Sequence, residues 1–118
     1  MDIDKINKGN VITAHSAITT TTTSARIDCR GKNSISIQTL ISVATKNWTF
    51  KVQGSMTENG TYTDWYELAN TGVMTPMSFQ TNASKGFAFK GIPDWVKIVA
   101  TEDEDGATVT VYAQPINL

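Results

Sequence analysis

The sequence predicts an all-β protein: an antiparallel, jelly-roll-like β-sandwich of about seven to nine short strands with an extended N-terminal arm. β-Branched and aromatic residues are common along the chain, and Gly and Asn residues punctuate them. Turn signals recur at intervals of about ten residues, which is typical of an antiparallel sandwich or barrel. No amphipathic helical pattern is longer than about one turn. We therefore expect an arm or edge strand over residues 1–24 and a β-sandwich domain over residues 25–118.

The N-terminal part of the chain is polar and poorly patterned. Residues 1–10 show no periodicity, and residues 19–23 are consecutive threonines. Threonine favours extended backbone, but an unbroken run leaves neither face of a strand apolar, so its register is weakly specified. The run is therefore expected to form an edge strand, or to belong to an arm that pairs with a neighbouring subunit.

Regular alternation of apolar and polar residues begins near Arg26. Residues 34–44 alternate cleanly except for Leu40, which falls on the polar face, and residues 48–53 alternate in the same way. Such alternation indicates strands with one buried face. The predicted inward-facing residues are Ile35, Ile37, Ile41, Val43, Trp48, Phe50 and Val52.

Turn signals divide the middle of the chain. Gly54 and the cluster Glu58-Asn59-Gly60 mark turns, and Asn-Gly is a strong signal for a short hairpin. The strands expected after these turns cover residues 62–68, 74–81 and 86–92.

The segments 95–100 and 109–113 are expected to form a closing β-hairpin with an acidic loop at residues 103–106. A slip of one residue would turn one apolar set outward, so burial fixes the register. The predicted pairs are Ala100 with Val109 and Ile98 with Val111. The residues predicted on the outer face of the hairpin are Trp95, Lys97, Val99 and Tyr112.

Length and charge exclude several classes of function. The chain has 118 residues and a formal net charge of −1, so it lacks the basic surface typical of nucleic-acid or membrane binding. No apolar run approaches the roughly 20 residues that span a bilayer. The N-terminus has no apolar segment of the kind found in secretory signals, so no signal peptide is expected.

Residues with catalytic or metal-binding chemistry are few and isolated. Cys29 is the single cysteine and lies in a strand-like segment, where a small buried residue is expected. His15 is the single histidine and has no second ligand at metal-binding spacing. The acidic run 102–106 is too compact for a calcium loop and indicates a solvated turn. We expect no catalytic residues, no metal, no cofactor and no enzymatic activity.

Aromatic residues suggest a contact surface instead. Trp95 and Tyr112 are expected on an outer face, and Trp65 is out of phase with Tyr62, Tyr66 and Leu68, so one of these two sets is expected to be exposed. Exposed aromatic residues indicate binding of either a protein or a glycan. The residues predicted to bind a partner, including apolar residues of the arm, are Ile3, Ile6, Val11, Ile12, Trp65, Trp95, Lys97 and Tyr112.

Two segments resemble a known family. Residues 50–55 (FKVQGS), followed by Gly60 and residues 64–68 (DWYEL), resemble the pattern V-x-G-S … G-x-W-x-x-L of small β-sandwich virion proteins of tailed bacteriophages. Residues 91–99 and 106–111 are similar to the closing hairpin of these proteins. The resemblance extends over most of the second half of the chain.

This resemblance implies a non-enzymatic virion protein, first of all a capsid decoration protein made in the host cytoplasm and carried on the capsid surface. Its implied partners are other copies of itself, the major capsid protein, or both, with no nucleic acid and no membrane. Two alternatives remain: a carbohydrate-binding sandwich module of a tail, fibre or surface filament, and a subunit of a self-assembling tube.

Overall fold

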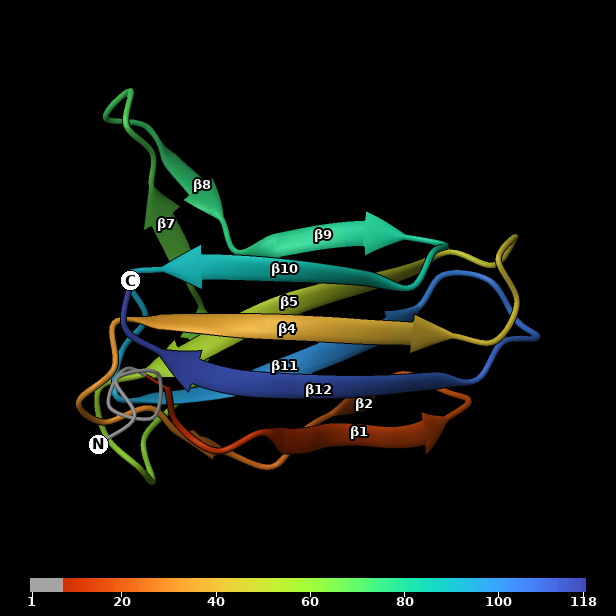
Figure 1. Cartoon of the computed structure of the whole chain (residues 1–118), viewed down its shortest axis with the longest axis horizontal. Coiled ribbons are helices and arrows are strands. Elements are labelled where there is room, and N and C mark those ends of the chain that lie inside the picture. Colours follow the sequence, from red (N-terminus) through yellow and green to blue (C-terminus); the bar gives the residue numbers. More distant parts are fainter. Residues whose placement is uncertain (1–7) are drawn as a thin grey trace.

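A computed structural model describes residues 8–118 and shows two packed antiparallel β-sheets (Figure 1). The front sheet has the strand order β1-β12-β4-β10. The back sheet has the order β2-β11-β5-β6, with β3 paired to β11 and β9 paired to β5, and β7 and β8 form a small sheet of their own. The predicted all-β antiparallel sandwich is confirmed. The strands are β1 Ile12–Ile18, β2 Thr22–Thr23, β3 Ile27–Asp28, β4 Ser34–Ile41, β5 Trp48–Ser55, β6 Thr63–Asp64, β7 Tyr66–Leu68, β8 Met74–Pro76, β9 Ser78–Thr81, β10 Lys85–Lys90, β11 Trp95–Glu102 and β12 Val109–Ile116.

Alternation decides which residues fill the space between the sheets. Successive side chains of a strand point to opposite faces, so every second residue of each long strand turns inward. Leu40 is exposed on the outer face of β4, as predicted. Val43 was expected inside but is exposed, because β4 ends at Ile41. Val43 lies beyond the strand, so alternation no longer places its side chain between the sheets. The large core residues are Ile35, Ile37, Trp48, Phe50, Val52, Met77, Val96, Ile98, Val109 and Val111.

The expected closing hairpin is wrong, because β11 and β12 belong to different sheets (Figure 1). In the back sheet Ile98 lies opposite Val52, and in the front sheet Val111 lies opposite Thr39. The alternating residues of both strands are buried as expected, but they meet across the core rather than side by side. Alternation determines which face of a strand points inward, but it does not determine which strand pairs with it. The connection after β11 therefore crosses from one sheet to the other.

Two expected strands break in the middle, so that β6 and β7 replace one and β8 and β9 replace the other, and the described residues contain twelve strands. The first break is at Trp65 and the second at Met77, and both residues turn toward β5. The Trp65 N–H donates to the Val52 carbonyl at 3.1 Å, and the Val52 N–H donates to the Met77 carbonyl at 2.9 Å. The Met77 N–H in turn donates to the Trp65 carbonyl at 3.0 Å. These bonds fix the base from which β7 and β8 leave the sandwich.

The segment 12–23 supplies one edge of each sheet. Strand β1 pairs with β12 at the edge of the front sheet, and β2 pairs with Val99 and Ala100 at the edge of the back sheet. The threonine run thus divides between a connection and a short edge strand. No helix from residue 8 onward is long and apolar enough to cross a bilayer.

His15 joins the two sheets at this edge. The buried imidazole of β1 reaches β11, where Nε2 lies 2.8 Å from the Ile98 carbonyl oxygen. A carbonyl oxygen accepts, so Nε2 carries the proton of this hydrogen bond. Burial lowers the pKa of His15 below its ordinary value of 6.5, and the hydrogen bond to Ile98 opposes that shift only in part.

Acidification is therefore expected to destabilise the fold through His15. His15 is protonated near pH 6.5 in the unfolded chain but only at lower pH in the folded chain. The stability that neutral His15 contributes is therefore complete above pH 6.5 and is lost as the pH falls toward the lowered pKa. Urea unfolding between about pH 5 and pH 8 should show a steeper loss of stability for the native chain than for His15→Gln. Parallel curves for the two proteins would contradict this assignment.

Candidate partner-binding surface

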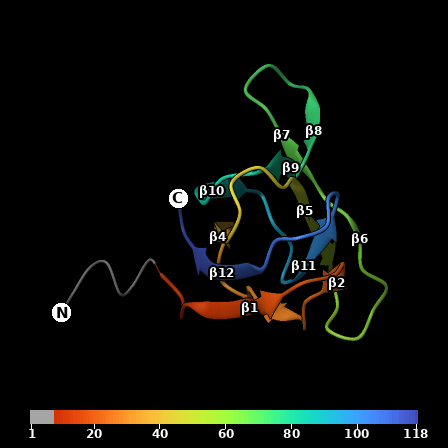
Figure 2. The ribbon, with the colours of Figure 1, turned by 90° about the vertical axis from the view of Figure 1, so that its right-hand side faces the viewer.

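The hairpin formed by β7 and β8 projects from the sandwich. Figures 1 and 2 show it rising beyond β9 and β10 in two views at right angles. Its two strands pair with each other, with Leu68 opposite Met74 and Tyr66 opposite Pro76. Residues directly opposite in an antiparallel pair share a face, as do residues two apart on one strand. Tyr66, Leu68, Met74 and Pro76 therefore form one apolar surface, which we call the hairpin face.

The hairpin face points into solvent. The side chains of Tyr66, Leu68 and Met74 are 47%, 65% and 55% exposed, and Pro76 is exposed beside them. Val73, at the turn, is also exposed. An apolar cluster on a projecting element has no stabilising role in an isolated chain and indicates a surface that another molecule covers.

The polar side of the hairpin turns toward the body of the protein. Glu67, between the two apolar residues of β7, accepts a hydrogen bond from the Lys90 N–H through Oε2 at 2.7 Å. Lys90 ends the edge strand β10, so this carboxylate satisfies an N–H that no neighbouring strand pairs. Thr75 Oγ1 donates to the Glu67 carbonyl at 3.3 Å. The hairpin is thus held with Glu67 against the body of the protein and its apolar residues outward.

Trp65 and Gly54 hold the base of the hairpin. The Trp65 indole packs against the core, and its Nε1–H donates to the Gly91 carbonyl at 2.9 Å. Gly54 lies beneath it, so close that a Cβ at this position would be 2.5 Å from Pro93 Cγ and 2.8 Å from Trp65 Cε3. The glycine therefore allows strand β5, Trp65 and the loop before β11 to pack together.

Gly54→Ala is expected to destabilise the protein by about 1–3 kcal/mol, because the new methyl group must displace Trp65 and Pro93. Gly86→Ala is the matched control, since Gly86 also lies in a strand and nothing is within 4 Å of its Cβ position. That variant should change the unfolding free energy by less than about 0.5 kcal/mol. Denaturant unfolding followed by tryptophan fluorescence measures both, and equal stabilities for the two variants would contradict the packing described.

Trp95 was expected on an exposed face, and this expectation is wrong. The ring lies on the outer side of the back sheet but is only 8% exposed, because the Arg30 guanidinium covers it with its carbon 4.8 Å from the ring centroid. Asp28 fixes the guanidinium by accepting two hydrogen bonds from it. Arg30 Nε donates to Oδ1 at 3.0 Å, and Nη2 donates to Oδ2 at 2.8 Å. The hydrogen bonds from Arg30 lower the pKa of the Asp28 carboxyl to about 2.

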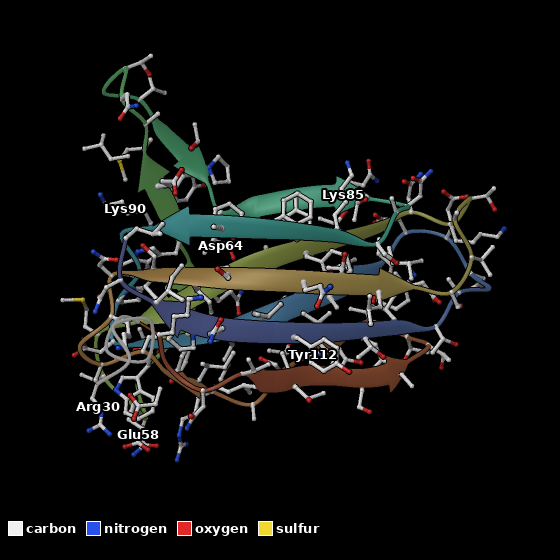
Figure 3. The ribbon with its side chains drawn as sticks, viewed as in Figure 1. Arg30, Glu58, Asp64, Lys85, Lys90 and Tyr112 are labelled. Atoms are coloured by element: carbon white, nitrogen blue, oxygen red, sulfur yellow. The ribbon has the colours of Figure 1, made fainter. Side chains whose placement is uncertain are left out.

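Lys97 and Tyr112 are not brought together. Lys97 lies on the outer side of the back sheet, with Nζ 4.4 Å from the centroid of the Tyr62 ring. Tyr112 lies on the front sheet, where Figure 3 labels it, beside Gln38 in the register of β12 and β4. The prediction of a shared outer face failed for the same reason as the hairpin: the two strands lie in opposite sheets.

The arm candidates fall in three places. Val11 is largely exposed just before β1. Ile12 packs against the core as part of β1. Ile3 and Ile6 lie outside the described residues.

The sequence pattern indicated two of the four residues of the hairpin face. Trp65 is out of phase with Tyr62, Tyr66 and Leu68, and the structure resolves this choice: Trp65 and Tyr62 are partly buried, and Tyr66 and Leu68 are exposed. Met74 and Pro76 were not singled out. Met74 and Pro76 form a second pair of alternating apolar residues after the turn, a pattern that predicts one apolar face of a hairpin. The pattern cannot show whether this face is buried or exposed.

The single cysteine and the single histidine are buried in the sandwich. Cys29 is completely buried, as expected, and burial raises the pKa of its thiol to about 12. His15 is committed to Ile98, as described above. Among residues 8–118 no group of three or more His, Cys, Asp and Glu side chains is placed to hold a metal ion.

Comparison with known proteins gives a likeness in fold. No protein-family model matches the sequence. No curated protein matches it either. Among solved structures, the crystal structure of SPBc2 prophage-derived protein YomS is similar, with a TM-score of 0.68 over 94% of both chains at 18% sequence identity. The chain therefore shares the fold of this prophage-derived protein over nearly its whole length.

Proposed function

We propose that the protein is a non-enzymatic structural component of a tailed-bacteriophage particle, and specifically a decoration protein that binds the capsid and neighbouring copies. The fold shared with a prophage-derived protein supports a phage-related structural role. The hairpin face supports attachment to another protein, and it is the observation on which the proposal chiefly rests.

A protein partner suits the hairpin face better than other ligands do. The face is apolar, stands clear of the sandwich and has free strand edges on both sides of a two-stranded sheet, where a partner can add main-chain hydrogen bonds. Apolar side chains that enter a pocket of a partner dominate the binding energy of most protein interfaces. A projecting hairpin of this kind is well shaped to enter a depression in a larger surface such as a capsid.

The glycan-binding alternative is weakened by the state of the tryptophans. A sugar-stacking platform requires an open ring face. Trp95 lies beneath Arg30, Trp65 is packed at the base of the hairpin with its Nε1 already bonded, and Trp48 is in the core. The exposed aromatic residue of the hairpin is Tyr66, whose neighbours on the face are aliphatic rather than hydrogen-bonding side chains.

Immunogold electron microscopy tests the proposal. Antibodies raised against the purified protein should label the heads of particles produced by the phage or prophage that encodes it. Labelling confined to tails would keep the structural role and overturn the capsid location. Particles that carry no label, with all of the protein free in the lysate, would overturn the structural role itself.

A further inference from the structure

An acidic loop lies at one end of the long axis of the molecule, and a groove whose lining has a net positive charge lies toward the other end. The molecule is 41 Å long, and the connection from β11 to β12 lies at one end, at the right of Figure 1. This connection contains the acidic loop, Glu102 to Asp105, four consecutive carboxylates. The loop of residues 56–62 and the residues around Arg30 and Glu58 lie at the other end (Figure 3).

The acidic loop has no cationic partner among the ion pairs of the described residues. Its carboxylates accept hydrogen bonds from neutral groups: Asp103 from Thr49 and Gln80, and Glu104 from Asn47. Interaction with the neighbouring Asp105 carboxylate raises the pKa of Glu102. The side chain of Lys46 passes close to Gly106, and one lysine cannot balance four carboxylates.

The opposite end has a groove of about 580 Å³ with an excess of positive charge. The charged residues that line it are Arg26, Glu58 and Lys97. Arg26 Nη2 lies 3.1 Å from Glu58 Oε1, so these two largely neutralise each other. Lys97 rests on the Tyr62 ring and is in none of the ion pairs found in the described part of the chain. We call this feature the basic groove.

We propose that the acidic loop of one copy binds in the basic groove of the next, so that copies associate head to tail. The inference deepens the proposed function, on which it rests, by identifying a second copy as one partner. The two surfaces complement each other in charge and belong to the same chain, so each copy offers both halves of the contact. A contact between different patches is heterologous and builds a ring or an open row.

A second copy fits the groove better than a nucleic acid does. Two cations beside a glutamate are too few to bind a phosphate backbone, and the chain as a whole is slightly acidic. Surface ion pairs contribute little individually, so the contact is expected to be weak between free molecules. It becomes effective when copies are held close together on one surface, where the local concentration reaches the millimolar range.

Sedimentation velocity of the purified full chain tests this contact by charge exchange. The native protein should self-associate at low salt, and about 0.5 M NaCl should weaken association about tenfold or more. Lys97→Glu and the double variant Glu102→Lys/Asp105→Lys should each lose self-association. Mixing the two variants should restore it, because lysines in the loop then face a glutamate in the groove. Lys85→Glu, an exposed charge reversal outside both surfaces, should associate like the native protein.

Absence of salt-sensitive association in the native protein at about 1 mM would overturn the head-to-tail contact. Variants that associate as well as the native protein, or a mixture that fails to recover association, would also overturn it. These outcomes leave the structural role intact, because immunogold labelling of particles depends on the hairpin face and not on this contact. Absence of the protein from particles, together with normal charge-dependent association, would overturn the structural role and leave the head-to-tail contact standing.

Discussion

Replacing Leu68 and Met74 by aspartate is expected to abolish incorporation of the protein into phage particles while leaving it folded. The two side chains lie opposite each other on the hairpin face and are 65% and 55% exposed, so the sandwich does not depend on them. Burial of two such side chains in an interface contributes about 3 kcal/mol or more. Its loss corresponds to about a hundredfold weaker binding, and the buried carboxylates would weaken binding further.

The measurement is the amount of the protein in purified particles made with each variant, by gel or mass spectrometry. Met56→Asp/Leu118→Asp is the matched control, because it replaces one methionine and one leucine that are 75% and 65% exposed elsewhere on the surface. Control particles should contain the normal amount of the protein. Equal incorporation of the hairpin variant and the control would remove the hairpin face from the attachment site.

Phe50→Ala is expected to cost about 3–5 kcal/mol of unfolding free energy, which is a large part of the stability of a domain of this size. Phe50 is completely buried in β5, with its ring centroid 6.4 Å from that of Trp48 and 5.3 Å from that of Phe79. Removal of the ring leaves a cavity between the two sheets, and the surrounding core relaxes into it only in part.

Tyr66→Ala provides the comparison for Phe50→Ala. It also removes an aromatic ring from a strand, but that ring is about half exposed on the hairpin face. Its unfolding free energy should stay within about 1 kcal/mol of the native value, measured by urea denaturation. A Phe50→Ala protein as stable as the Tyr66→Ala protein would contradict the placement of the core.

The alternating residues of the chain predicted its core well and its strand neighbours poorly. Val96, Ile98, Val109 and Val111 are all buried, as expected from their period of two. The pairing of these strands depends on whether the connection after β11 turns back or crosses the core. Both paths bury the same side chains, so the pattern cannot distinguish them. The failed hairpin and the separation of Lys97 from Tyr112 have this one cause.

The exposed site was harder to predict than the core for a related reason. Tryptophan offers the largest contact area, so Trp65 and Trp95 were reasonable candidates. Arg30 covers Trp95 from a distant part of the sequence, and Trp65 is taken up at the base of the hairpin by Gly91, Gly54 and Pro93. Such contacts are set by tertiary structure. The apolar residues of the hairpin face are smaller than tryptophan. Their alternation along the strands is the same pattern that a buried face shows.

The attachment of the protein through its hairpin face is the central claim, and hydrogen exchange tests it most directly. Exchange of the amides of residues 66–76 is measured on the free protein and on the protein bound to particles. The free strand edges of this hairpin should exchange fast in the free protein and slow markedly on the particle. Unchanged exchange in the hairpin, with new protection elsewhere on the bound protein, would contradict the claim.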